Sequence, residues 1–138
     1  MKAPLHQWSV RVYYEDTDTA GVVYHANYLK FMERARTECL RALGWSLSHL
    51  KHQGVQFVVR QAEIDFYRPA VLEDELLVTT GLAHVGGASL TFEQKIYLAV
   101  ISPTTRLCQA KIKMACVDHN FKPGPVPTRL IKELQGEY

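Results

Sequence analysis

Residues 14–36 read YEDTDTAGVVYHANYLKFMERAR, and this stretch contains the change of pattern that decides the fold. Its first half gathers acids, a glycine and a histidine in a short non-helical segment. Its second half begins a run with helical periodicity. Loops held between rigid elements carry a disproportionate share of catalytic residues, and the start of a helix leaves unpaired backbone N–H groups. We therefore expect a functional site at this junction.

The second half predicts one long amphipathic helix. Asn27 is expected to cap its start and Gly44 to end it. Apolar side chains recur at helical spacing from position 28 to position 43, and charged side chains are expected on the other face. The apolar positions are Tyr28, Phe31, Met32, Ala35, Cys39, Leu40, Ala42 and Leu43, and the charged positions are Lys30, Glu33, Arg34, Arg36, Glu38 and Arg41.

Strand patterns lie on both sides of this helix. Residues 7–13 alternate apolar and polar side chains, which predicts a strand that ends in the acidic segment. After a connection over 45–54, period-two alternation predicts four more strands, clearest at 90–98 and 108–116. Turn residues separate them at 68–70, 86–87 and 102–105. Residues 122–138 are expected to form a C-terminal tail with one or two helical turns around Leu130, Ile131 and Leu134.

These elements predict an α+β fold in which a five-stranded antiparallel sheet wraps one long central helix. The only economical packing places the apolar face of the sheet against the apolar stripe of the helix. We expect a single domain over residues 1–138. A small sheet of this kind leaves its edge strands open, so pairing with a second copy of the chain is expected.

Composition excludes several classes of protein. The net charge is only +2 across 138 residues, which does not favour a nucleic-acid partner. No apolar run is long enough for a signal peptide or a membrane span, so a cytoplasmic location is expected. The three cysteines show no CxxC spacing and are expected to be buried, reduced thiols. His49 and His52 lack a carboxylate at ligand spacing, so we expect no metal and no cofactor.

Two acids in the loop are candidates for chemistry. Asp16 and Asp18 fit a solvated or helix-capping turn as well as a catalytic pair, and their spacing does not rank them. Gly21 permits a close backbone approach, and His25 and Asn27 stand at the helix entrance, where N–H groups can stabilise an oxyanion. A carboxylate there stays ionised at neutral pH, so it suits a nucleophile or a base rather than a general acid.

The stretch from Tyr14 to Arg36, together with residues 66–70 (FYRPA), closely resembles the signature of hotdog-fold acyl-CoA thioesterases. The resemblance is to the 4-hydroxybenzoyl-CoA thioesterase family, and within it to the YbgC-type branch associated with the Tol-Pal system. It implies the hotdog fold, homodimers with the active site at their interface, and homotetramers of two such dimers. It also implies that Asp18 is the nucleophile or general base and that the main-chain N–H at His25 polarises the thioester carbonyl.

Further expectations depend on the same resemblance. His25 is typical of the YbgC-type branch, which favours short aliphatic acyl groups over 4-hydroxybenzoyl. Tyr14 and Tyr24 are candidates to line the pocket, with packed aromatics as the alternative, and Asp16 is expected to brace the loop. Candidates for the CoA phosphates are Arg60, Arg68 and Lys95, with Lys111 and Lys113 beside them. The family also implies phospholipid metabolism, acyl carrier protein as a partner, and a place at the inner membrane.

Two other functions fit the same fold. A non-catalytic acyl-CoA-binding module would use the cleft without needing a carboxylate at position 18. A hotdog dehydratase or hydratase would carry its acid on the central helix, where Glu33 and Glu38 lie, but neither has a histidine beside it on the same face.

Overall fold

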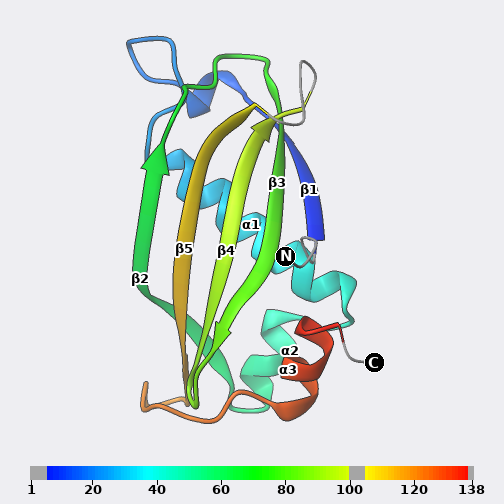
Figure 1. The fold of residues 1–138 in the computed structure, drawn as a ribbon. Helices are drawn as coiled ribbons and strands as arrows, with labels where there is room; N and C mark the ends of the chain where they lie inside the picture. Colours follow the sequence, from blue (N-terminus) through cyan, green and yellow to red (C-terminus); the bar gives the residue numbers. More distant parts are fainter. Residues whose placement is uncertain (1–5, 100–104, 137–138) are drawn as a thin grey trace.

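The computed structural model describes residues 6–99 and 105–136, which form one sheet and three α-helices (Figure 1). Part of the turn predicted at 102–105 lies outside these residues. The strands are β1 (His6–Arg11), β2 (Gln56–Phe66), β3 (Glu75–Val85), β4 (Ser89–Leu98) and β5 (Arg106–Val117). The helices are α1 (Asn27–Ala42), α2 (Leu47–His52) and α3 (Thr128–Leu134), and a 3-10 turn, η1, spans Tyr14–Asp16.

The sheet is antiparallel with the strand order β1-β3-β4-β5-β2, so β1 and β2 are its two edges. The predicted α+β fold is confirmed: α1 crosses one face of the sheet, which curves around it (Figure 1). The turn predicted at 86–87 joins β3 to β4, where the Gly86 N–H donates to the Ser89 carbonyl at 2.9 Å. The first strand ends at Arg11, two residues before its predicted end. The Val12 N–H donates to Asp74 O, in the segment that precedes β3.

Local sequence rules predicted the end of α1 correctly but not its start. The prediction for Gly44 is confirmed: its φ is +89°, its N–H donates to Arg41 O, and the Trp45 N–H donates to Leu40 O. This is the Schellman arrangement that a left-handed glycine allows. The prediction for Asn27 as the cap is wrong. Ala26 occupies the N-cap position without a side-chain bond, and the Asn27 amide instead reaches back to Asp16.

The charged face predicted for α1 is wrong at one position, because Arg36 is only 8% exposed. The connection predicted at 45–54 contains α2, whose start is capped by the Ser46 hydroxyl accepting from the His49 N–H at 3.1 Å. Six residues are too few for a clear period, which is why the pattern missed this helix.

The C-terminal segment carries α3, which buries Leu130 and Leu134 in the same core as α1. The Trp45 indole N–H donates to Glu133 at 2.5 Å and ties α3 to the end of α1. In Figure 1, α3 lies beside α2 at the lower right of the molecule.

The core lies between α1 and the inner face of the sheet. Alternate residues of β4 and β5 point inward and are buried, as the period-two pattern predicts. Cys39, Cys108 and Cys116 are free and buried there, which confirms the predicted reduced thiols. Burial raises the pKa of Cys39 to about 11 and that of Cys108 to about 12, so both thiols stay protonated at neutral pH. In the part of the chain that the structure describes, no helix is long and apolar enough to cross a membrane.

Candidate active site

The acidic segment folds as a small hairpin between β1 and α1. After η1, Thr17 pairs with Val23, and the Asp18 N–H donates to Val22 O at 2.9 Å. The turn closes when the Gly21 N–H donates to Asp18 O at 3.0 Å, with Gly21 at a φ of +79°. No heavy atom lies within 4 Å of a Cβ placed on Gly21, so glycine serves the left-handed turn rather than a tight contact within this chain.

Asp16 braces this hairpin against the helix. One carboxylate oxygen accepts from the Tyr13 N–H at 2.8 Å and the other from the Asn27 amide at 3.3 Å. Its carbonyl oxygen accepts from the Tyr24 N–H at 2.8 Å and again from the Asn27 amide at 3.1 Å. Asp16 and the buried Asn27 therefore hold the loop at a set position relative to the start of α1.

Asp18 has the opposite environment. Its side chain is exposed, and one carboxylate oxygen accepts from the Ala20 N–H at 2.8 Å. Among the described residues, the second oxygen accepts no hydrogen bond. The loop thus separates a bonded acid from an acid that is available to a substrate or to water.

The start of α1 offers backbone donors beside this acid. The Asn27 N–H donates to Tyr24 O at 2.8 Å and the Leu29 N–H to Ala26 O at 3.2 Å. Within the described residues, the N–H groups of His25, Ala26 and Tyr28 find no acceptor. Free N–H groups at a helix N-terminus, in the field of the helix dipole, suit a developing negative charge on oxygen.

Aromatic side chains surround these donors. The His25 ring lies 4.5 Å from Tyr24 and 6.3 Å from Phe66, measured between ring centroids. Tyr14 and Tyr24 are exposed, so neither is a packed core aromatic in this chain. Tyr28 is different: its hydroxyl accepts from the Ala70 N–H at 3.0 Å, and burial raises its pKa.

The predicted CoA cations fall in two places. Arg68 is exposed and follows β2, two residues from Phe66, and Arg60 is exposed at the irregularity of β2 between Val59 and Gln61. Lys95 lies on the sheet face away from α1, because its neighbour Gln94 points inward to Met32, and its ammonium sits 3.5 Å from Glu93. Lys111 and Lys113 alternate with inward-facing Ala110 and Ile112 and share that outer face.

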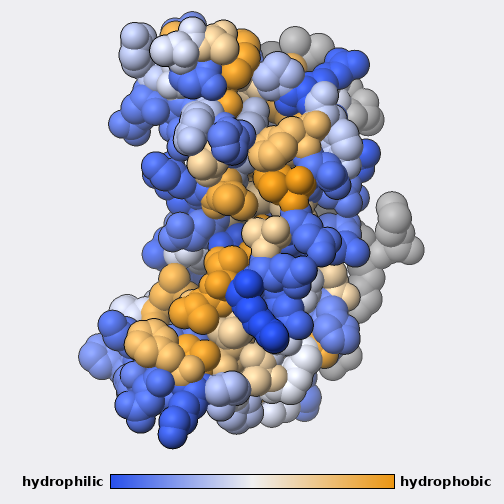
Figure 2. Space-filling model, turned by 90° about the vertical axis from the view of Figure 1, so that its left-hand side faces the viewer, coloured by the Kyte–Doolittle hydropathy of each residue, from blue (hydrophilic) through white to orange (hydrophobic). Residues whose placement is uncertain are grey.

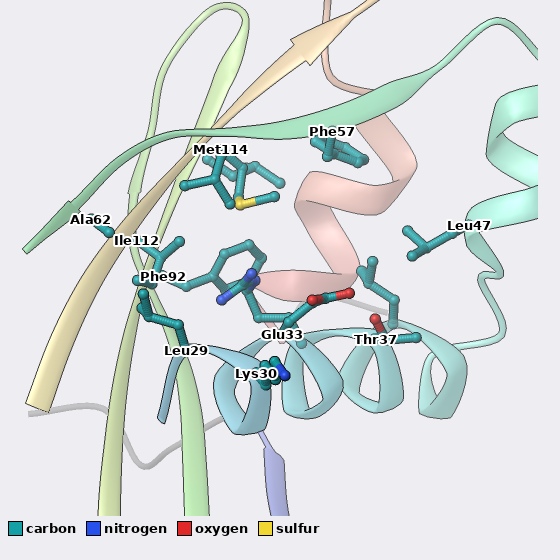
Figure 3. Close-up of a pocket in the computed structure, with 14 residues that line it drawn as sticks. Leu29, Lys30, Glu33, Thr37, Leu47, Phe57, Ala62, Phe92, Ile112 and Met114 are labelled. Atoms are coloured by element: carbon teal, nitrogen blue, oxygen red, sulfur yellow. The ribbon is translucent and has the colours of Figure 1, made fainter. Parts of the chain in front are cut away.

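A cavity of about 460 Å³ lies between α1, α2 and the inner face of the sheet (Figure 3). It starts at Leu29, two residues beyond Asn27, and extends past Leu40 to Leu47. The sheet side contributes only apolar side chains, namely Phe57, Val59, Ala62, Leu90, Phe92, Ile112 and Met114. The helix side contributes Lys30, Glu33, Arg36 and Thr37. Residues 6–99 and 105–136 contain no group of three or more His, Cys, Asp or Glu side chains that could hold a metal ion.

Sequence patterns missed the contact between two buried polar residues of this region, Arg36 and Gln94. Arg36 lines the cavity, and its Nη1 donates to the Gln94 side-chain oxygen at 2.9 Å. Gln94 sits at an inward position of β4 where the alternation favours an apolar residue. A polar residue on the buried face of a strand was the one signal that could have revealed this contact.

Comparison with known proteins identifies the family of this chain. A family model described as "Thioesterase superfamily" matches residues 20–100, a range that begins two residues after Asp18. The acyl-CoA thioester hydrolase YbgC of Escherichia coli O6:H1 is 43% identical over 136 residues, covering 98% of this chain and 99% of that protein. The acyl-CoA thioesterase YbgC of Haemophilus influenzae is 49% identical over 120 residues, covering 86% and 85%.

A solved structure of a thioesterase shares this fold. A probable thioesterase from Bartonella henselae superposes with a TM-score of 0.81 at 38% identity, covering 88% of this chain and 98% of that one. Fold and site together define a hotdog-fold thioesterase. The chain belongs to the thioesterase superfamily and, within it, to the YbgC acyl-CoA thioesterases. The resemblance found in the sequence is confirmed.

Proposed function

We propose that this thioesterase hydrolyses short-chain aliphatic acyl-CoA to free CoA and a carboxylic acid, with Asp18 as the catalytic carboxylate. Hydrolysis of acyl-CoA follows from the family, whose curated members carry that activity in their names. The observation that carries the role of Asp18 is the contrast within one loop. Both carboxylate oxygens of Asp16 accept a hydrogen bond, whereas Asp18 keeps one carboxylate oxygen free among the described residues.

The mechanism uses the two halves of the junction. The thioester carbonyl oxygen accepts hydrogen bonds from the N–H groups around His25, which stabilise the charge that develops on it. Asp18 then acts in one of two ways. It attacks the carbonyl carbon and expels the CoA thiolate, leaving a mixed anhydride that water cleaves, or it takes a proton from the water that attacks. Both routes consume one water and release one thiol and one acid.

A homodimer that completes the site, and a tetramer of two dimers, are part of the proposal. Support comes from β2, an edge strand that leaves Val58, Val59 and Phe66 exposed. In the space-filling view from this side, hydrophobic residues gather in a band down the middle of the face (Figure 2). An open edge beside exposed apolar side chains favours strand pairing with a second copy. We further propose that residues 1–138 form one hotdog domain.

Substrate contacts outside the reacting atoms follow from position. Tyr14, Tyr24 and Gly21 flank the loop and are proposed to contact the substrate, whereas Asn27 is proposed to act through Asp16 because its amide is already bonded there. Arg60 lies on the edge strand β2 and Arg68 follows it, so both are near the edge proposed to pair with a second copy. We propose these two arginines for the CoA phosphates in preference to Lys95, which lies on the outer face of the sheet. The cytoplasmic location, the inner-membrane association and an acyl carrier protein partner are proposals supported by family resemblance.

A thiol-release assay with saturated acyl-CoAs from two to sixteen carbons tests the function. The short esters are expected to turn over fastest. Asp18→Asn keeps the shape of the side chain but removes its charge, and kcat is expected to fall by about 10²–10⁴. Glu15→Gln, at an exposed acid of the same loop, is the matched control and should leave the rate unchanged.

Three results would contradict the proposal. Near wild-type turnover by Asp18→Asn would remove the catalytic role of Asp18. Acyl-CoA binding without turnover in the wild-type protein would favour a binding module. Hydration of crotonyl-CoA without thiol release would favour a hydratase. Rapid-quench mass spectrometry then separates the two routes, because only nucleophilic attack leaves an acylated Asp18.

A further inference from the structure

The two walls of the cavity differ in chemistry. The sheet wall is apolar throughout, whereas the helix wall carries an ammonium, a carboxylate, a guanidinium and a hydroxyl from Lys30, Glu33, Arg36 and Thr37. Lys30, Glu33 and Thr37 are labelled on the helix side in Figure 3. The formal charges of this wall sum to +1, from +1, −1 and +1. A cavity for a plain alkyl chain needs no such wall, because charged groups cost free energy to desolvate against it.

Arg36 is held in a set position by a buried network. Its Nη1 donates to the Gln94 side-chain oxygen at 2.9 Å, and the residue is 8% exposed. The Gln94 amide nitrogen donates to Met32 O at 2.9 Å and to the Thr80 hydroxyl at 3.0 Å. Because Gln94 is bonded to both the helix and β3, it fixes the guanidinium relative to α1 and the sheet.

Most of the hydrogen-bonding capacity of Arg36 is unused. A guanidinium has five N–H donors, and the described residues provide an acceptor for Nη1 only. No carboxylate of the described residues lies within ion-pair distance of Arg36. Neither Nε nor Nη2 is sealed from solvent, since the one sealed and unpartnered side-chain nitrogen or oxygen in the described residues is Nδ1 of His6. Nε and Nη2 therefore keep some accessible surface, and Arg36 is one of the residues that line the cavity.

Arg36 is also at a suitable depth. It lies eight residues beyond Tyr28, about 12 Å along the helix axis from the free N–H groups. Helical side chains tilt toward the N-terminus, which brings the guanidinium back toward those groups. The remaining gap suits a short acyl group. Burial lowers the pKa of Arg36 and nearby Glu33 raises it, and a guanidinium keeps its charge at neutral pH in either case.

Building on the proposed thioesterase function, we propose that Arg36 is a specificity-determining residue that binds a carboxylate at the far end of a short acyl group. The preferred substrates are then ω-carboxyacyl-CoA esters, such as succinyl-CoA or glutaryl-CoA. A carboxylate matches the paired N–H donors of a guanidinium, whereas a methyl end leaves them desolvated and unpaired. The reaction is unchanged: water cleaves the thioester, giving CoA and a dicarboxylic acid.

The test compares esters that differ only at the far end of the chain. The kcat/KM of succinyl-CoA is measured against that of butyryl-CoA, and glutaryl-CoA against valeryl-CoA. The wild-type enzyme is expected to prefer the carboxylated ester by about tenfold or more, and Arg36→Met to lose or reverse that preference. Arg34→Met is the matched control: Arg34 is exposed on the same helix, does not line the cavity, and should keep the wild-type ratio.

A second variant and a second readout keep the test independent of folding and of turnover. Arg36→Lys retains the charge without the paired donors, so it should keep part of the preference if Arg36→Met fails to fold. Binding of non-hydrolysable thioether analogues of succinyl-CoA and butyryl-CoA reports the same preference without chemistry. If no acyl-CoA releases thiol, the proposed function fails, while tighter binding of the carboxylated analogue still supports the role of Arg36.

Two results would overturn the proposal. One is an equal ratio of the two esters in the wild-type enzyme and in Arg36→Met, in both turnover and binding. The other is weakened dimerisation of Arg36→Met with an unchanged ratio, which would mean that Arg36 pairs with a carboxylate of a second copy.

Discussion

The acidic loop and the cavity wall both present charged side chains, but they hold them in different ways. The loop positions Asp18 through hydrogen bonds between residues close in sequence, from Tyr13 to Asn27. The cavity wall positions Arg36 through Gln94, which is 58 residues away along the chain. The loop is exposed and the Arg36 network is buried. We therefore expect substitutions in the loop to affect activity more than stability, and substitutions in the cavity network to affect stability more strongly.

The largest effect on stability is expected from Gln94→Leu. The change removes the acceptor of Arg36 and leaves a buried guanidinium unpaired, which should lower the free energy of unfolding by about 3–4 kcal/mol. Urea denaturation measures it. Gln109→Leu, which removes an exposed hydrogen bond to Arg106 on the outer face, is the control and should cost well under half as much. Equal costs would mean that the network adds nothing to the stability of the cavity wall.

Alkaline pH should lower the free energy of unfolding through two buried thiols of the core. The folded pKa values of Cys39 and Cys108 lie near 11 and 12, above the ordinary value of 9.0, so the unfolded chain loses these protons first. Stability is then retained below pH 9 and lost as pH rises toward 11–12, by about 1.4 kcal/mol per thiol at pH 10.

Denaturation curves between pH 8 and pH 10 measure this loss. Cys108→Ala should make the free energy of unfolding depend less steeply on pH. Cys116→Ala provides the comparison, because burial also raises the pKa of Cys116. An unchanged slope in Cys108→Ala would show that this thiol does not contribute.

Asn27→Ala tests the loop side of the comparison. It removes the amide that bonds to Asp16, so stability should fall by about 1–2 kcal/mol, while displacement of the loop from the helix N-terminus should lower kcat by about tenfold to a hundredfold. Asn120→Ala, at an exposed turn, is the control. A loss of stability without a loss of kcat would break the distinction between the two regions.

The smallest effect is expected from Gly21→Ala. Alanine at a φ of +79° costs about 1 kcal/mol even though nothing obstructs its Cβ. Gly87→Ala is the matched control, because that glycine also has free space around it but no left-handed φ. Thermal unfolding should separate the two, and equal melting temperatures would argue against a strained turn.

Local periodicity predicted much of this fold correctly. The apolar repeat of α1, the alternation of β4 and β5, and the glycine at position 44 each depend on residues within one element, so their patterns are visible in the chain. The failures have a common cause. Asn27 could cap α1 on local rules, but its amide nitrogen donates to Asp16, so the side chain is held toward the acidic loop. Arg36 follows the charged pattern of the helix surface, but the sheet closes over it.

The candidate site divides in the same way. The acidic loop became a candidate from its residues, because carboxylates, a glycine and a helix start lie within one short segment, but the role proposed for Asp18 came from the family resemblance. The difference in environment between Asp16 and Asp18 required the folded loop, since only hydrogen-bond geometry shows which carboxylate is occupied. The sequence marked Gln94 as a polar residue on a buried strand face, but it did not show that Arg36 is its partner. The two residues meet across α1 and β4, and a contact between distant segments leaves no period in either of them.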